Sequence, residues 1–261
     1  MSDPRAVKVL FLNGWSLDSS FVEPLLQALG EGVTYQVLDV DARFFEDSWP
    51  SSLVSLIDQD TVIMGWSLGG MLAIRLAAFL EKNQRDYRKL VTLMASPSFI
   101  NREGWSCGMS ESDFAQFKMA AESDQLVVKT FPYLMLGPKQ SVVGTSETTL
   151  LANRTLLSEI RQRYRGSLQS SENRIATLAL LEQLDLRKEL SALQQQAILL
   201  FAEDDLLVPN MTAQVVEQLY PHHHVHLVEG EGHLLNAPIL KLVSTLLGLS
   251  LGTSAAVTCE R

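Results

Sequence analysis

Short apolar runs alternate with segments of helical periodicity over the first 95 residues of the chain. Brief apolar runs bounded by polar residues are typical of buried strands, whereas apolar residues spaced three and four apart are typical of helices. Strands are predicted at residues 7–12, 35–40, 61–64 and 90–94. Helices are predicted at residues 21–29, 53–57 and 71–80. Because strands that alternate with helices form right-handed βαβ units, we expect an α/β fold with a mostly parallel sheet flanked by helices.

The pattern changes between residues 97 and 190, where helical periodicity occurs without a convincing β run. Helices are predicted there at residues 113–121, 125–135, 148–164 and 174–184. Beyond it, strands are predicted at 197–201 and 225–228 and helices at 211–219 and 239–247. We therefore predict an α/β core of residues 1–96 and 191–249, interrupted by a helical insertion at 97–190 that covers a site on the sheet as a lid. Residues 250–261 are small and polar and are expected to be frayed.

A candidate nucleophile directly follows the third predicted strand. Residues 65–69 read GWSLG, which matches G-x-S-x-G, a tight strand-to-helix turn whose glycines let the serine stand above the edge of the sheet. Such a match arises by chance in about one chain in ten. Here a strand precedes it and a helix follows it, which is the context that the motif requires. We therefore predict that Ser67 is a nucleophile rather than an incidental serine in a glycine-rich turn.

A serine hydroxyl needs a base beside it and a group that orients the base. In this motif the partners follow the serine in the order acid, then histidine. Glu203, Asp204 and Asp205 follow the fifth predicted strand, and His233 lies in a glycine-rich loop after the sixth. We predict Asp205 as the acid, with Asp204 as its rival, and His233 as the base. One or both aspartates can also cap the turn before Pro209.

An oxyanion hole requires two backbone N–H groups aimed at the developing negative charge. The first candidate is the amide of Leu68, the residue after the nucleophile. The second is expected in the loop after the first strand, where Trp15 is the candidate donor. Its indole can wall the acyl pocket, or it can pack at the edge of the core.

Composition and charge narrow the class of protein further. A net charge of −9 over 261 residues argues against a broad nucleic-acid surface, which needs a basic footprint. The two cysteines, Cys107 and Cys259, lie far apart and favour a reduced, cytoplasmic protein. No signal peptide and no apolar run near the length of a membrane span is found in the sequence, so a soluble protein, taken as a monomer, is expected.

Four further histidines cluster at the entrance to the last predicted strand. They are His222, His223, His224 and His226. We interpret them as a solvated loop, with a metal site as the less favoured alternative.

With these residues in place, the chain resembles the α/β-hydrolase superfamily over nearly its whole length. Within it, the chain is similar to the pimeloyl-[acyl-carrier protein] methyl ester esterases of biotin synthesis. The shorter matches are NGW at 13–15, GWSLGG at 65–70, ASPSF at 95–99 followed by GW at 104–105, DLR at 185–187 and LVP at 207–209. Their order and spacing agree with the family.

This resemblance implies that Ser67, Asp205 and His233 form a catalytic triad and that Trp15 and Leu68 form the oxyanion hole. The acyl-channel residues that it implies are Phe99, Phe131, Pro132, Tyr133, Leu134 and Met135. From periodicity alone, the apolar stripe that contains Phe131 can equally well be the core of the insertion. The family needs no metal and no organic cofactor, and its ester substrate is carried on an acyl carrier protein.

The chain departs from the family in two places. Asn13 replaces a histidine in the loop that leads to Trp15. Leu126 and Thr130 stand where the family has basic residues that dock the acidic carrier. Nearby cations that can replace them, or that simply face solvent, are Lys129, Lys139, Arg154, Arg161, Arg163 and Arg165.

The sequence therefore predicts a serine carboxylesterase that hydrolyses the methyl ester of pimeloyl-acyl carrier protein through an acyl-enzyme. A general short-chain carboxylesterase, a thioesterase or a carbon–carbon hydrolase would use the same triad, so these stay open as alternatives. A third hypothesis is a ligand-binding protein that kept the fold without turnover.

Overall fold

A single parallel sheet organises the computed structural model, which describes residues 7–45, 49–138 and 147–249. The strand order is β2-β1-β3-β4-β5-β6, and every neighbouring pair is parallel. The strands are β1 Val7–Leu12, β2 Val33–Leu38, β3 Thr61–Trp66, β4 Lys89–Leu93, β5 Ile198–Ala202 and β6 His224–Val228. The predicted α/β class is confirmed. The winding direction reverses between β1 and β3, and such switch points are where open α/β sheets place their sites.

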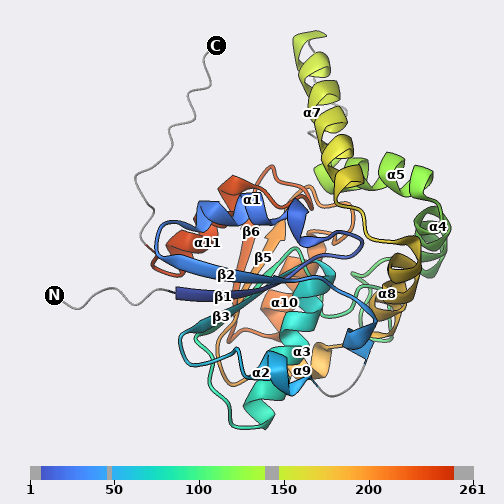
Figure 1. The fold of residues 1–261 in the computed structure, drawn as a ribbon. Helices are drawn as coiled ribbons and strands as arrows, with labels where there is room; N and C mark the ends of the chain where they lie inside the picture. Colours follow the sequence, from blue (N-terminus) through green and yellow to red (C-terminus); the bar gives the residue numbers. More distant parts are fainter. Residues whose placement is uncertain (1–6, 46–48, 139–146, 250–261) are drawn as a thin grey trace.

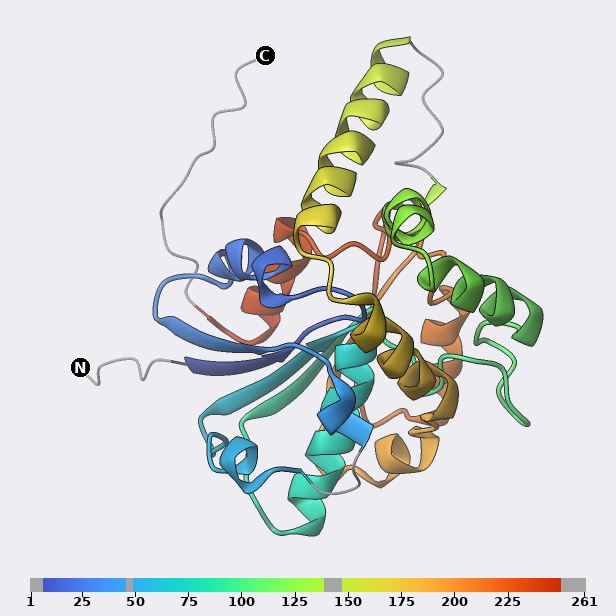
Figure 2. The ribbon, with the colours of Figure 1, turned by 45° about the vertical axis from the view of Figure 1, so that its right-hand side comes forward.

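Helices cover both faces of the sheet. In Figure 2 the sheet lies between α3 on one side and the pair α1 and α11 on the other. The core helices are α1 Glu23–Leu26, α2 Ser51–Val54, α3 Leu68–Lys82, α9 Arg187–Ala192, α10 Met211–Leu219 and α11 Ala237–Leu246. Three short 3-10 turns join them, η1 Ser19–Phe21, η2 Gln27–Leu29 and η3 Ala42–Phe45. Most of α3 is buried, because it packs against β1, β3 and β4 at the centre of the molecule.

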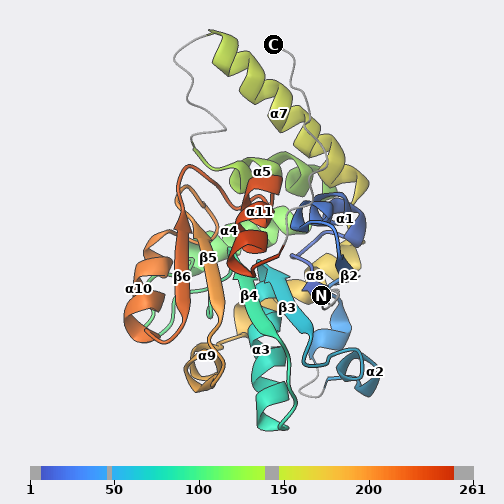
Figure 3. The same cartoon turned by 90° about the vertical axis from the view of Figure 1, so that its left-hand side faces the viewer.

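The helices of residues 97–190, the helical insertion, gather beyond the carboxyl ends of the strands (Figure 1). They are α4 Glu111–Ala121, α5 Asp124–Leu136, α7 Glu147–Gly166 and α8 Ser171–Gln183. Figure 3 shows α7 extending away from the rest of the molecule. Within the described ranges, no helix combines the length and the apolar character needed to cross a bilayer.

Local predictions differ from the structure mainly at the first helix and at β2. The predicted helix at 21–29 is broken into η1, α1 and η2. β2 starts at Val33, not at Tyr35, and ends at Leu38. It is an edge strand with mostly exposed or half-buried side chains, so its apolar pattern does not mark its bounds. The short helix α9 was not predicted. The predicted frayed tail at 250–261 lies outside the described residues.

Candidate active site

Ser67 occupies the sharp turn between β3 and α3. Its backbone has φ 56° and ψ −124°, a region that residues other than glycine rarely adopt. The turn requires glycine at positions 65 and 69, because other main-chain atoms lie where a side chain would stand. A Cβ on Gly69 would lie 2.0 Å from the carbonyl oxygen of Leu12, and one on Gly65 would lie 2.2 Å from that of Gly69. The turn therefore holds the Ser67 hydroxyl at the end of the sheet.

The side chains of Ser67, His233 and Asp205 form a continuous hydrogen-bonded chain. His233 Nε2 lies 2.9 Å from Ser67 Oγ, and His233 Nδ1 lies 2.6 Å from Asp205 Oδ2. The second carboxylate oxygen of Asp205 accepts the backbone N–H groups of Leu207 and Val208 at 2.7 and 2.9 Å. His233 and Asp205 are both buried. Their shielding from water strengthens these interactions, and the two amides fix the carboxylate in place.

Asp204, which precedes Asp205 in the chain, is held differently from it. The backbone N–H of Asp204 donates to the carbonyl of Glu231 at 2.9 Å, which joins the acid loop to the histidine loop. The carboxylate in contact with the His233 ring is that of Asp205, the one preferred from the sequence.

One contact that supports the histidine loop was not predicted. The indole N–H of Trp66 donates to the backbone carbonyl of His233 at 2.9 Å. The residue before the serine thus fixes the residue that bears the base. The two residues are separated by 167 positions in the chain, so no local pattern indicates this bond.

The backbone amides of Trp15 and Leu68 are the candidate oxyanion donors. Among the residues that the structure describes, neither amide donates a hydrogen bond, which leaves both N–H groups available. Asn13, the departure from the family, is wholly buried and organises this loop. Its amide nitrogen donates to the carbonyl of Leu17 at 3.0 Å and to Asp39 Oδ1 at 3.3 Å. Its oxygen accepts the N–H of Gly14 at 2.9 Å.

A narrow, mostly apolar pocket lies at Ser67, with an enclosed volume of only about 10 Å³. It is lined by Gly14, Trp15, Trp66, Ser67, Phe99, Phe117, Phe131, Met135, Leu181, Leu207 and His233. Ring centroids of Phe131 lie 4.9 Å from those of both Trp15 and Phe117, so aromatic side chains close the pocket on the side of the insertion. The wall suits an apolar acyl group.

The predicted channel residues divide into two groups. Phe99, Phe131 and Met135 line the pocket, together with Trp15. Pro132, Tyr133 and Leu134 are not among the lining residues, and Tyr133 is 37% exposed. The difference follows from helix geometry, because consecutive residues of α5 cannot all face one side. Phe117, Leu181 and Leu207 were missed. Of these, Phe117 lies in a helical apolar stripe that could have indicated it.

The helical insertion also contacts the acid and histidine loops. A Cβ on Gly137, at the end of α5, would lie 2.4 Å from the carbonyl oxygen of Asp204. One on Gly232 would lie 2.5 Å from that of Leu136. The N–H of Leu234 donates to the carbonyl of Met135 at 2.9 Å. The carboxyl end of α5 is therefore packed directly on both loops.

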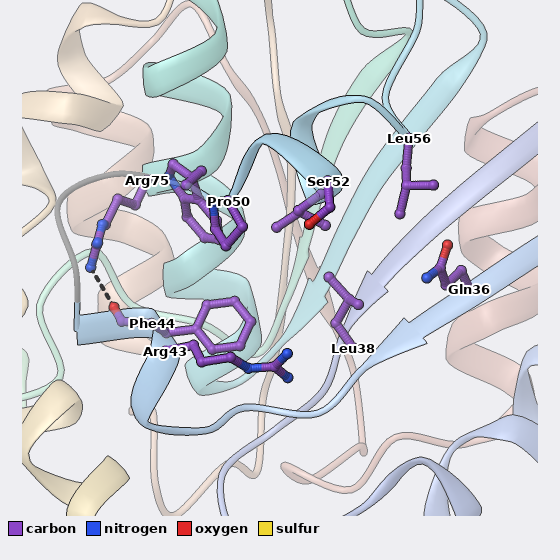
Figure 4. Close-up of a pocket in the computed structure, with 10 residues that line it drawn as sticks. Gln36, Leu38, Arg43, Phe44, Pro50, Ser52, Leu56 and Arg75 are labelled. Carbon is purple, nitrogen blue, oxygen red and sulfur yellow. Dashed lines mark hydrogen bonds between the residues drawn. The ribbon is translucent and has the colours of Figure 1, made fainter.

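A larger hollow of about 360 Å³ lies along edge strand β2, between η3, α2 and α3 (Figure 4). Its walls include Leu38, Phe44 and Trp49, and Arg75 donates to the carbonyl of Phe44 at 2.9 Å. It shares no lining residue with the pocket at Ser67. Pocket size alone does not identify the site here, because the pocket that contains Ser67 and His233 is the smaller of the two.

The histidine cluster is held by hydrogen bonds to neighbouring loops. The Nε2 atoms of His222 and His223 lie 3.2 and 3.0 Å from the carbonyls of Leu193 and Leu190. Burial lowers the pKa of His223, so its ring is neutral at neutral pH. In the part of the chain that the structure describes, no three His, Cys, Asp or Glu side chains are grouped to hold a metal ion.

Two of the candidate carrier-docking cations donate to backbone carbonyls of neighbouring segments. Arg163 donates to the carbonyl of Phe21 and stacks over its ring at 4.5 Å, and Arg161 donates to the carbonyl of Lys129 at 3.0 Å. Arg154 and Arg165 are exposed on α7. Leu126, in the place of a family cation, is 46% exposed. Lys139 lies outside the described residues.

Comparison with known proteins shows which protein family the chain belongs to. The sequence profile of the alpha/beta hydrolase family matches residues 9–243, and the chain belongs to that family. The resemblance predicted from the sequence is confirmed.

Particular relatives follow from pairwise similarity. The pimeloyl-[acyl-carrier protein] methyl ester esterase of Xylella fastidiosa (strain M12) is 28% identical over 243 residues, which are 89% of each chain. The biotin biosynthesis bifunctional protein BioHC of Cellvibrio japonicus (strain Ueda107) is 29% identical over 242 residues, which are 89% of this chain. Those residues are 45% of the bifunctional protein, so the chain spans about half the length of that relative.

Solved structures agree in fold. An esterase from Exiguobacterium antarcticum has a TM-score of 0.71 and 16% identity, over 93% of this chain and 92% of the esterase. A bromoperoxidase from Bacillus anthracis has a TM-score of 0.69 and 21% identity, over 93% of this chain and 90% of the other. At such identities the likeness establishes the shared fold.

Proposed function

We propose that the protein is a serine carboxylesterase with Ser67 as nucleophile, His233 as general base and Asp205 as the acid that orients it. The observation that carries the proposal is the chain of two hydrogen bonds, of 2.9 and 2.6 Å, that joins the three side chains. A serine hydroxyl becomes a useful nucleophile at neutral pH when such a chain removes its proton. A ligand-binding protein would have no need of this arrangement.

The reaction follows from this arrangement. Ser67 Oγ attacks the ester carbonyl carbon while His233 Nε2 takes the hydroxyl proton, and Asp205 stabilises the imidazolium that forms. The amides of Trp15 and Leu68 donate to the carbonyl oxygen as it becomes an oxyanion. The imidazolium then protonates the leaving alcohol. Water, deprotonated in turn by His233, attacks the acyl-enzyme, and the carboxylic acid and free Ser67 result. These steps need no metal or organic cofactor.

Within this class we propose the methyl ester of pimeloyl-acyl carrier protein as the substrate. Support comes from the names of the relatives from Xylella fastidiosa and Cellvibrio japonicus, which refer to that ester and to biotin biosynthesis. The helical insertion acts as the lid, and the exposed Arg154 and Arg165 of α7 are its candidate contacts to an acidic carrier. The free, buried thiol of Cys107 suits the cytoplasmic location predicted from the sequence.

A general short-chain esterase is the second candidate, and one observation favours it. The rings of Trp15, Phe117 and Phe131 close the acyl side of the pocket, with centroid separations of 4.9 to 5.2 Å. The enclosed space at Ser67 is about 10 Å³, so any acyl group displaces these rings, and the seven-carbon pimeloyl chain requires a larger displacement than a short acyl group does.

The reaction class is tested by substitution of the nucleophile. Ser67→Ala should lower kcat/KM for short p-nitrophenyl esters by several orders of magnitude and abolish labelling by a fluorophosphonate probe. The matched control is Ser55→Ala, an exposed serine whose hydroxyl bonds only the carbonyl of Ser52. It should leave both measurements unchanged. Near-normal turnover by Ser67→Ala would refute the mechanism.

The substrate is tested in a bacterial strain that cannot release the free pimeloyl group. Expression of the protein should restore growth without biotin, and expression of Ser67→Ala should not. If the protein is well expressed and hydrolyses short esters but does not restore growth, the short-chain esterase is the correct function.

A further inference from the structure

The loop that carries the candidate oxyanion donor is paired with the helical insertion. We call residues 13–18 the oxyanion loop. We call residues 164–169, which comprise the end of α7 and the segment that leads toward α8, the strap. Leu17 and Leu168 form an antiparallel bridge. On one side of it the N–H of Asp18 donates to the carbonyl of Ser167, and on the other the N–H of Gln169 donates to the carbonyl of Ser16, both at 2.9 Å. The strap thus acts as a short extra strand beside the loop.

Two side-chain hydrogen bonds strengthen this pairing at the donor itself. The hydroxyl of Ser16 lies 2.6 Å from the phenol of Tyr164, and neither residue is exposed to solvent. The indole N–H of Trp15 donates to the carbonyl of Arg174, in α8, at 2.9 Å. Trp15 and the residue that follows it are therefore both bonded to the insertion.

The backbone of Ser16 needs such support. Its φ is +73°, in the left-handed region that a residue other than glycine rarely adopts. A strained conformation persists when surrounding contacts over-determine it. Burial raises the pKa of the Tyr164 phenol, so the phenol stays protonated and keeps its hydrogen bond over the working pH range.

We propose that Tyr164 is a positioning residue for the oxyanion hole: its phenol fixes Ser16 and thereby aims the Trp15 amide at the reacting carbonyl. This inference rests on the proposed esterase function. It gives the helical insertion a part in transition-state stabilisation in addition to covering the pocket. Tyr164 itself does not line the pocket at Ser67, so it acts through the loop.

Tyr164→Phe tests this role, since it removes only the phenol oxygen. Loss of a whole oxyanion donor typically lowers kcat by about 10²–10³. Because a displaced donor retains part of its effect, we expect kcat to fall roughly 5- to 30-fold. KM should stay within about twofold, since the interaction forms only in the transition state. The affinity for a trifluoromethyl ketone, which forms an oxyanion adduct with the serine, should fall by the same factor as kcat.

Tyr87→Phe is the matched control. Tyr87 is also buried, and its phenol donates to Glu81 Oε1 at 2.8 Å, away from the pocket at Ser67. Both variants lose one buried tyrosine hydrogen bond, so both should unfold at lower temperature. Only Tyr164→Phe should change kcat and the ketone affinity, which separates positioning from general stability.

A double-mutant cycle with Ser16→Ala tests whether the pair acts as a unit. Ser16→Ala should lower kcat about as much as Tyr164→Phe, and the double variant should lose no more than the larger single loss. Fully additive losses would show that Tyr164 does not act through Ser16. If Tyr164→Phe does not fold, Ser16→Ala decides alone, and a normal kcat in that variant overturns the proposal.

The outcomes separate this inference from the function on which it rests. If Ser67→Ala retains turnover, the proposed esterase mechanism itself is wrong. If Ser67→Ala is inactive while Tyr164→Phe keeps the kcat of the wild type, the esterase stands and the positioning role is wrong. A raised KM at constant kcat also overturns it, because that result assigns Tyr164 to substrate binding.

Discussion

The two halves of the candidate catalytic centre are held in different ways. The turn at Ser67 is fixed by backbone packing within the core, where glycines allow main-chain atoms to meet with no space for a side chain. The oxyanion loop is fixed from outside, by hydrogen bonds to the strap and to α8. The position of Ser67, the proposed nucleophile, therefore depends on the core alone, whereas the proposed oxyanion hole depends on the insertion as well. Changes in the insertion can adjust the reaction without disturbing the nucleophile.

The largest effect is expected from a side chain added in the turn. Gly69→Ala should lower the free energy of unfolding by more than about 3 kcal/mol or prevent folding, because the Cβ would lie 2.0 Å from a backbone oxygen that cannot move aside. The control is Gly166→Ala in the strap, where a Cβ meets nothing within 4 Å. Urea denaturation should show a change within about 0.5 kcal/mol there. Similar losses of unfolding free energy in Gly69→Ala and Gly166→Ala would show that the turn at Ser67 is packed no more tightly than the strap.

An intermediate effect is expected from the buried arginine of the insertion. Arg174 is 1% exposed, and its guanidinium donates to the carbonyl of Gln169 at 2.7 Å and pairs with Asp124. Arg174→Met should lower the free energy of unfolding by about 2–3 kcal/mol, because the carbonyl of the half-buried strap residue Gln169 loses its donor and Asp124 loses its partner. Arg154→Met, at an exposed position on α7, should change it by less than about 0.5 kcal/mol. Equal effects at the two positions would show that Arg174 does not hold the strap.

The smallest effect is expected at Asp39, beside the oxyanion loop. Burial raises the pKa of this carboxyl above its ordinary value of 3.8, although the hydrogen bond from Asn13 acts in the opposite direction. The folded state therefore binds the proton more tightly, and the stability that this provides is lost as pH rises through the folded pKa. Asp39→Asn should thus be more stable than the wild type at pH 7, and the difference should shrink as pH falls toward 3.8.

The control for this pH dependence is Asp58, whose pKa the hydrogen bond from Lys8 lowers. Its stabilisation is present above pH 3.8 and is lost as pH falls through the folded pKa. Denaturation of Asp39→Asn and Asp58→Asn across pH 3–7 should therefore give differences of opposite sign from the wild type. Stability differences of the same sign in the two variants would show that burial does not raise the pKa of Asp39.

The features that were predicted from the sequence are those that a local pattern encodes. The parallel sheet follows from alternating periodicities, and Ser67, Asp205 and His233 follow from a turn motif and the order of its partners. The bounds of β2 were wrong because an edge strand has little apolar pattern. The roles assigned to Pro132 and Tyr133 came from a contiguous match, which ignores the facing of a helix.

The contacts that could not be predicted join distant segments. The bond from Trp66 to His233 and the pair of Ser16 with Tyr164 span 167 and 148 positions. Each member looks like an ordinary buried residue in its own segment. The first contact arises from packing within the core and the second from packing of the insertion on the core, and a single sequence without its structure carries no sign of either.

The attachment of the insertion at two internal points, on either side of α7, limits how it can open. The end of α5 is packed on the acid and histidine loops, and the strap is paired with the oxyanion loop. A segment anchored at two such points cannot swing about one hinge as a rigid door. Entry to Ser67 then depends on rotation of side chains such as Phe117 and Phe131, which close the pocket. We therefore expect the aromatic rings of Phe117 and Phe131 to act as the gate. The Trp15 amide, the proposed oxyanion donor, should stay in position while substrate passes.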